Sequence, residues 1–216
     1  GDPKLVVERL HELMRAIQDK GIRVIRGDIL LDNSVFRLPA HDAAAFDDDP
    51  LRPYNAGPDG LLVNFKALIF KFIPDPASQR VRVQTEPPMA GVDIPAEVPA
   101  AAGACGAWRP RLAADFTDPN HIRFAGRYPT SCGEQSWGIA YPEPRSYAPR
   151  VIEALWRAAG GAMTGQVKWM DGPATGQPLV TGFSLPLADI IADINKFSNN
   201  VMAQQLFLTL SARDGR

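Results

Sequence analysis

The chain has 216 residues, of which 45% are hydrophobic and 22% charged, and its formal net charge is −1 at pH 7. This length is enough for one large domain or two modest ones with a substantial core. The near-neutral charge provides no electrostatic footprint for nucleic acid or an anionic membrane surface, and 20 prolines and 18 glycines argue against a helical bundle.

The first predicted element is an amphipathic helix over Leu5 to Lys20, because apolar residues recur there at helical spacing. Gly21 follows as its left-handed cap. Residues Ile22 to Leu31 are rich in branched side chains and predict a buried strand. From Asp32 to Gly60 the pattern dissolves into acidic residues, proline, asparagine and glycine, which is typical of a solvated connection.

The central region, residues 61 to 141, is predicted to be all-β and to be inserted domain material. Leu61 to Ile73 and Gln79 to Thr85 flank a Pro-Asp-Pro turn and predict a hairpin. A second hairpin is expected within residues 107 to 140, from Arg111 to Phe116 and from His121 to Tyr128, with a further strand at its end. Polar residues interrupt the most apolar run, so we expect no transmembrane segment.

Two cysteines, Cys105 and Cys132, flank the second hairpin. Antiparallel strands joined by a short turn bring their outer ends together, so the thiols can meet within disulfide reach. Such a bond contributes about 3 kcal/mol in the chain-entropy model and indicates an oxidising compartment. The alternative is two unpaired buried thiols in a cytosolic protein. Because two Cys cannot complete a tetrahedral shell and His11, His41 and His121 are isolated, we expect no metal site and no cofactor.

The last part of the chain returns to helical spacing. A helix is expected over Tyr147 to Ala159, followed by short strands at Gln166 to Met170 and Leu179 to Phe183. Two apolar, helix-like runs, Pro186 to Ile194 and Val201 to Leu210, then close the chain.

The polar stretch between these two runs contains Ser198 and Asn200. In a continuous helix, residues two apart face different directions, so both can reach one substrate only if the helix breaks here. Ser and Asn favour such breaks because their short side chains cap the next helix. A simple helix cap, with no catalytic role, is the alternative.

Four separated segments resemble one family in the same order. Lys-x-Ser-Asn-Asn followed by Val-Met-Ala-Gln-Gln-Leu resembles the Ser-x-Asn segment of serine penicillin-recognising enzymes. The match is best with the D-alanyl-D-alanine carboxypeptidase/endopeptidase group, the low-molecular-mass class C penicillin-binding proteins. The other segments are Gly1-Asp2-Pro3, the stretch Gly27 to Phe36, and Gly57-Pro58-Asp59 leading into Val63-Asn64-Phe65.

The resemblance implies roles for particular residues. It assigns Ser198 to a proton relay between nucleophile, lysine and leaving group, and Asn200 to a hydrogen bond with the substrate amide carbonyl. It places Asp32 beside the cleft, facing the amino end of the stem-peptide side chain, with Phe36 as a neighbour. A structural turn is the alternative for Asp32 and Phe36. Lys196 tunes the local field or is only a solvated cation at a helix end.

Two motifs of this enzyme class are absent from the 216 residues. No Ser has Lys three residues later, the spacing that puts an amine beside a nucleophilic hydroxyl on one helix face, and no Lys-Thr-Gly occurs. The chain therefore resembles the middle of such an enzyme and is expected to be inactive alone. The expected fold is α+β: a partial penicillin-binding-protein/β-lactamase-like transpeptidase domain over residues 1–32 and 179–216, with mainly-β accessory material at 33–178.

The leading hypothesis is a periplasmic, serine-type D-Ala-D-Ala carboxypeptidase/endopeptidase that acts on peptidoglycan stem peptides and binds β-lactams. A non-catalytic cell-wall-binding or interaction module is the main alternative, and a small solute-binding α+β protein is a weaker one. Missing parts of the same protein, a symmetry mate or rearranged packing are expected to cover the apolar faces of the first and last helices.

Overall fold

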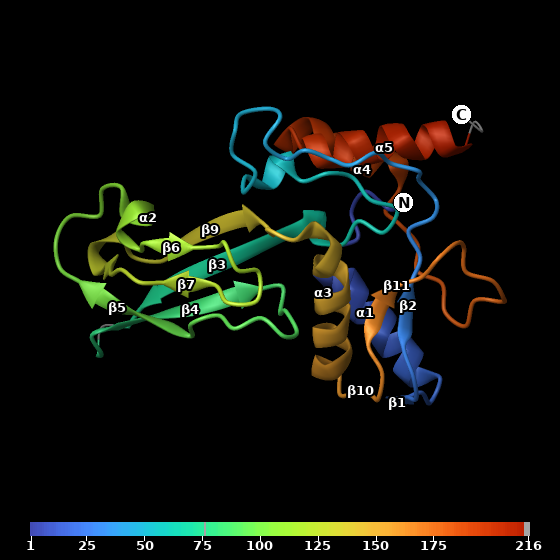
Figure 1. Cartoon of the computed structure of the whole chain (residues 1–216), viewed down its shortest axis with the longest axis horizontal. Coiled ribbons are helices and arrows are strands. Elements are labelled where there is room, and N and C mark those ends of the chain that lie inside the picture. The colour runs from blue at the N-terminus through green and yellow to red at the C-terminus, as the bar shows by residue number, and fades with distance from the viewer. Residues whose placement is uncertain (76, 214–216) are drawn as a thin grey trace.

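The computed structural model describes residues 1–75 and 77–213. Figure 1 shows a curled sheet at one end, a layer of helices and short strands beside it, and the C-terminal helices across the top. The helices are α1 (Val7–Asp19), α2 (Trp108–Arg111), α3 (Pro144–Ala158), α4 (Leu187–Phe197) and α5 (Asn200–Arg213), and the 3-10 turns are η1 (Pro53–Asn55), η2 (Asn64–Lys66) and η3 (Thr130–Cys132).

The strands range from two to eight residues in length. They are β1 (Val24–Ile25), β2 (Ile29–Leu31), β3 (Ala67–Pro74), β4 (Arg80–Glu86), β5 (Glu97–Ala101), β6 (Ala114–Asp115), β7 (Arg123–Phe124), β8 (Tyr128–Pro129), β9 (Gln135–Ala140), β10 (Ala162–Met163) and β11 (Val167–Trp169). The mixture of helices and sheets confirms the predicted α+β class.

The main sheet has the strand order β8-β5-β4-β3-β9. The antiparallel pair β3 and β4 confirms the first predicted hairpin, with Phe70 opposite Thr85; residue 76 of its turn lies outside the described residues. Apolar side chains alternate along β3, and Leu68, Phe70 and Phe72 are all fully buried. One face of the sheet therefore covers a core, as the period of two residues requires.

The second hairpin is much shorter than the sequence predicted. Only Ala114–Asp115 and Arg123–Phe124 pair, while residues 108–111 form α2 and Tyr128–Pro129 pairs in parallel with β5. This part of the chain instead supplies rings to the core, where Phe124 packs edge-on against Phe70 at a centroid distance of 5.2 Å. In this part of the chain, packing of buried aromatic rings stabilises the structure more than strand pairing does.

The predicted disulfide is present. Cys105 and Cys132 are bonded, and their Cα atoms are 4.7 Å apart. The bond ties the loop before α2 to η3, at the edge of the sheet that contains Tyr128, whose hydroxyl donates a hydrogen bond of 2.9 Å to the Gly133 carbonyl.

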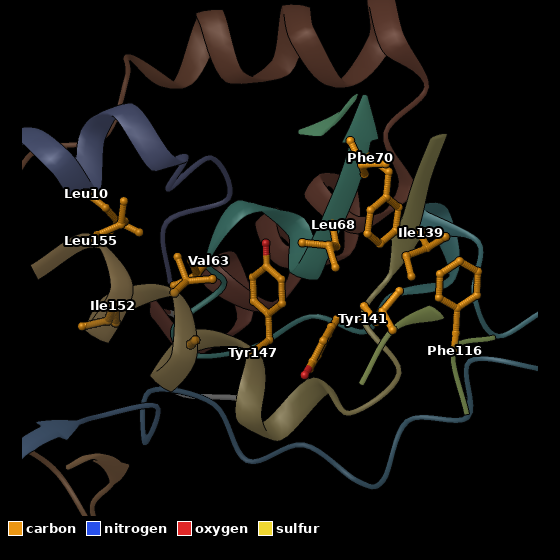
Figure 2. Packing of buried hydrophobic residues seen from close by; sticks show 14 of the residues in the cluster. Leu10, Val63, Leu68, Phe70, Phe116, Ile139, Tyr141, Tyr147, Ile152 and Leu155 are labelled. Carbon is orange, nitrogen blue, oxygen red and sulfur yellow. The ribbon is translucent and has the colours of Figure 1, made fainter. Parts of the chain in front are cut away.

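A second unit brings together the start of the chain, residues 7–31, and the segment from α3 to β11. The strand expected over Ile22 to Leu31 is two short strands, because Gly27 at φ 120° interrupts it. The expected burial is wrong for much of this segment, since Val24 is 54% and Leu30 is 52% exposed. β1 and β2 pair in parallel with β10 and β11, which follow α3. Figure 2 shows Leu10 of α1 against Leu155 of α3. Leu10 is 2% exposed, so the apolar face of the first helix is covered within the chain itself. The expectation that residues outside the chain or a symmetry mate cover this helix is therefore wrong, because α3 covers it.

The strand expected at Leu179 to Phe183 is wrong, because these residues pair with no other strand and Phe183 is 83% exposed. They belong to an irregular connection between β11 and α4. The domain boundaries at residues 32 and 178 stay predictions. On one side of the molecule, the N-terminal elements α1, β1 and β2 pack with α3, β10 and β11 (Figure 1). Among the described residues no helix combines the length and apolar character needed to cross a bilayer.

Candidate active site

The helix breaks at Ser198, as the predicted convergence of Ser198 and Asn200 requires. α4 ends at Phe197, and Ser198 takes left-handed backbone angles of φ 49° and ψ 42°. α5 begins two residues later, at Asn200. A non-glycine residue in this region costs about 1–2 kcal/mol, so the sharp turn persists because its surroundings enforce it.

The cap of α5 is Asn199, which the sequence argument did not single out. Its side-chain Oδ1 accepts a hydrogen bond of 3.0 Å from the Met202 N–H, and its carbonyl accepts one of 3.1 Å from the Ala203 N–H. Within the described residues, none of the hydrogen bonds found involves the Ser198 hydroxyl or the Asn200 side-chain amide, and both residues are exposed. Their polar groups are therefore available to a substrate.

Lys196 and Phe197 form an exposed pair beside the break. The Lys196 ammonium lies 5.2 Å from the centroid of the Phe197 ring, which is 65% exposed. An ion-aromatic contact this exposed to solvent is weak. Lys196 lies two residues from Ser198, near enough in sequence to add positive charge to this end of α4.

Asp32 lies at the end of β2 and closes a turn. Its Oδ1 accepts a hydrogen bond of 2.8 Å from the Ser34 N–H, and its Oδ2 accepts one of 2.8 Å from the Ala174 N–H. The Ala174 N–H, followed by the hydroxyl and N–H of Ser34, holds the pKa of this carboxyl below its usual range. Asp32 is therefore an anion that joins two loops, with acceptor capacity left on both oxygens.

Three cavities lie along the segment between Leu38 and Asn55. Phe36 lines a cavity of about 620 Å³ together with Lys66 and Trp169. Asn200 lines a smaller one of about 150 Å³ with His41. Ser198 and Asp32 line none of the three, so the structure does not gather the four predicted residues into one pocket.

His41 lines the candidate site, and the sequence did not predict this role because an isolated histidine forms no recognisable motif. It lines all three cavities, including an open apolar groove of about 500 Å³ against α5. Its Nε2 lies 2.7 Å from the Asn55 carbonyl oxygen, which fixes the ring against η1. His41 therefore forms a shared wall between the Phe36 cavity and the Asn200 cavity.

The segments that carried the sequence resemblance meet around one residue of α5, Gln205. A Cβ atom at Gly1 would lie 2.3 Å from Gln205 Nε2 and 2.9 Å from Phe36 Cε2, so a larger residue at this position would require one or both of these side chains to shift. The Gln205 amide also bonds to Asp59 of the Gly-Pro-Asp segment. Two segments far apart in sequence, at Gly1 and at Asp59, thus contact the helix that begins at the Ser-x-Asn turn, and Phe36 lies beside Gly1.

A family model described as the D-Ala-D-Ala carboxypeptidase 3 (S13) family matches residues 1–216. A curated protein of Haemophilus influenzae, D-alanyl-D-alanine carboxypeptidase DacB, is 23% identical over 214 residues, which are 96% of this chain and 43% of that protein. The chain therefore spans less than half the length of this relative.

Solved structures show the same fold. The crystal structure of penicillin binding protein 4 (dacB) from Haemophilus influenzae matches with a TM-score of 0.71 and 22% identity, covering 100% of this chain and 48% of that one. The same protein complexed with a novel β-lactam matches with a TM-score of 0.60 and 21% identity, over 96% and 44% of the two chains.

Proposed function

The chain belongs to the D-Ala-D-Ala carboxypeptidase 3 (S13) family, and on that premise we propose that it is the middle part of a periplasmic, serine-type D-Ala-D-Ala carboxypeptidase/endopeptidase acting on peptidoglycan stem peptides. The observation that carries the proposal is the Ser-x-Asn turn within a chain that the family model matches throughout. At this turn, Asn199 supplies the helix cap, while Ser198 and Asn200 keep their polar groups exposed.

The proposed reaction is acyl transfer in two steps. A serine hydroxyl outside these residues attacks the carbonyl of the terminal D-Ala-D-Ala bond, and a neighbouring lysine takes its proton. As the peptide bond breaks, Ser198 donates its hydroxyl proton to the departing D-alanine amine and takes in return the proton held by the lysine, so that both groups recover their starting state. Asn200 donates its side-chain N–H to a substrate amide carbonyl and so orients the scissile bond. Water then attacks the acyl-enzyme ester and regenerates the serine.

Asp32 and Phe36 are proposed to meet the side chain of the stem peptide. The low pKa of Asp32 supports this role, because a permanent carboxylate can accept hydrogen bonds from an amino group. The place of Phe36 in the wall of the 620 Å³ cavity gives the apolar part of a side chain a surface to contact. The Ala174 N–H would hold the carboxylate in position.

The rest of the proposed protein covers the C-terminal helices. On α5, Phe207 is 69% exposed and borders the apolar groove of about 500 Å³. On α4, Leu187 is 52% exposed. Apolar area of this kind is stabilised by burial at about 25 cal/mol per Å², which favours coverage by further residues of the longer protein.

The disulfide supports a location outside the cytosol, since such bonds persist in oxidising compartments. The test of the function is release of D-alanine from a peptide ending in D-Ala-D-Ala by the full-length protein. We expect release that a penicillin blocks and that Ser198→Ala reduces. Absence of D-alanine release from well-folded full-length protein would contradict the proposal and favour a non-catalytic wall-binding module.

A further inference from the structure

We propose that Gln205 is a positioning residue for the Ser-x-Asn turn, acting through a buried polar network that ties α5 to Asp59, Lys66 and Asn33. This inference rests on the proposed function and adds a residue to it. Gln205 belongs to α5, five residues beyond Asn200, and its side chain is fully buried. Rigid helical geometry therefore transmits any shift at Gln205 to Asn200, about 7.5 Å away along the axis.

Gln205 binds the backbone of one residue with both ends of its amide. Its Oε1 accepts a hydrogen bond of 3.1 Å from the Asp59 N–H, and its Nε2 donates one of 2.6 Å to the Asp59 carbonyl. Two bonds to one peptide segment fix both the distance and the rotation of the helix there. A buried amide that lost this partner would leave unsatisfied groups, so the pairing is strongly specified.

The side chain of Asp59 extends the network in two directions. Its carboxylate lies 3.0 Å from the Lys66 ammonium, which is buried and also donates a hydrogen bond of 3.2 Å to the Gly57 carbonyl. The same carboxylate accepts a bond of 3.4 Å from Asn33 Nδ2. Asn33 directly follows Asp32, so the network joins the Ser-x-Asn helix to the other predicted binding segment.

An unusual turn holds Lys66 in place. Asn64, Phe65 and Lys66 take positive φ angles of 42°, 56° and 53°, a run of three non-glycine residues in the left-handed region. Phe65 packs on the small cluster that contains Val201, the residue after Asn200. The turn therefore supports the start of α5 through Phe65, and it supports Gln205 indirectly through the contact of Lys66 with Asp59. These contacts account for the backbone strain at this turn.

If the network only stabilises the fold, its loss leaves the acylation rate of each folded site unchanged. If it positions the Ser-x-Asn turn, its loss lowers that rate. Gln205→Met keeps length and volume but cannot form the two bonds. In the full-length protein, acylation by a fluorescent penicillin gives two readouts: the amount bound at saturation counts folded active sites, and the rate per site reports positioning. We expect close to one penicillin per molecule and a rate per site reduced at least about tenfold, because small misplacements of reacting groups cost that much or more.

The matched control is Tyr128→Phe, which removes a different side-chain hydrogen bond, that of a residue in the main sheet. It should retain the wild-type rate per site. The inference is overturned if Gln205→Met acylates at the wild-type rate per site, or if Tyr128→Phe slows it equally. If Gln205→Met yields no protein that binds penicillin, Asn33→Ala is the deciding variant. A decrease of about threefold in its acylation rate per site supports the network, and an unchanged rate overturns it.

Failure of the proposed function gives a different result. Wild-type full-length protein that binds no penicillin would contradict the enzyme proposal, and the positioning role with it. Wild-type protein that acylates, beside an equally fast Gln205→Met variant, would contradict only the positioning role.

Discussion

The Oδ1 atom of Asn199 caps α5 by accepting a hydrogen bond from the Met202 N–H at 3.0 Å. Because the middle residue of Ser-Asn-Asn performs this structural task, the flanking residues are not needed for it. Ser198 is therefore not the N-cap of α5. Its left-handed backbone instead makes it the C-cap of α4, and its exposed side chain takes no part in that cap. A catalytic role for Ser198 stays a prediction.

Replacing Ser198 by Ala in the full-length protein should slow penicillin acylation by at least about 100-fold, the usual contribution of a positioned proton-transfer group. The melting temperature should change little, since the hydroxyl is exposed. Ser136→Ala, an exposed serine of β9, is the matched control and should acylate normally. Normal acylation by Ser198→Ala would remove this residue from the mechanism.

Asn199→Ala should instead act on stability. Loss of the cap is expected to cost about 1 kcal/mol of unfolding free energy, measured by urea denaturation. Asn199→Asp keeps an acceptor for the Met202 N–H and should restore most of that loss. Equal destabilisation by both variants would show that the cap bond is not the cause.

The buried ion pair between Lys66 and Asp59 predicts a strong coupling. Lys66→Met leaves a largely buried carboxylate without its cation and should destabilise the protein by about 3 kcal/mol. Adding Asp59→Asn removes that orphaned charge, so the double variant should be more stable than the sum of the two single changes. Additive losses in chemical denaturation would argue against a direct interaction.

Removal of the disulfide should destabilise the accessory sheet without affecting the chemistry. Cys105→Ser with Cys132→Ser is expected to lower the unfolding free energy by about 3 kcal/mol, because a loop spanning a sequence separation of 27 is no longer closed. The acylation rate per titrated site should stay at the wild-type value. Wild-type protein should bind a thiol reagent only after reduction, and labelling before reduction would contradict the pairing.

Tyr128 predicts a loss of stability in alkali. Burial raises the pKa of its hydroxyl to about 12, above the ordinary value of 10.0. The folded state therefore holds this proton more tightly than the unfolded state, so its contribution is full below pH 10 and declines by about 2 kcal/mol as the pH rises to 12. Tyr128→Phe should show a flatter decline over this range in denaturant titrations. Parallel curves for the two proteins would contradict the assignment.

The sequence predicted features that depend on local pattern. Alternating apolar residues around a Pro-Asp-Pro turn predicted the β3–β4 hairpin, and a polar stretch between apolar runs predicted the break at Ser198. Sequence patterns gave wrong predictions where the structure of a segment depends on pairing with a distant strand. The apolar run Leu179 to Phe183 forms no strand because no other strand pairs with it.

The network around Gln205 could not be predicted from the sequence. A glutamine in an apolar helix does not reveal its hydrogen-bond partner, and here the partner, Asp59, is 146 residues away in the sequence. In the left-handed turn at Asn64 to Lys66, only Asn64 is a residue type that favours this backbone, and Phe65 and Lys66 give no such signal. Both features depend on tertiary contacts that override local preference.

The most direct test of the central claim is the intact mass of the protein before and after incubation with a penicillin. We predict that the full-length protein gains the mass of one drug molecule, and that the 216-residue chain alone, which contains no Ser-x-x-Lys, gains none. No adduct on folded full-length protein would contradict the enzyme assignment. An adduct on the 216-residue chain would contradict the placement of the nucleophile outside these residues.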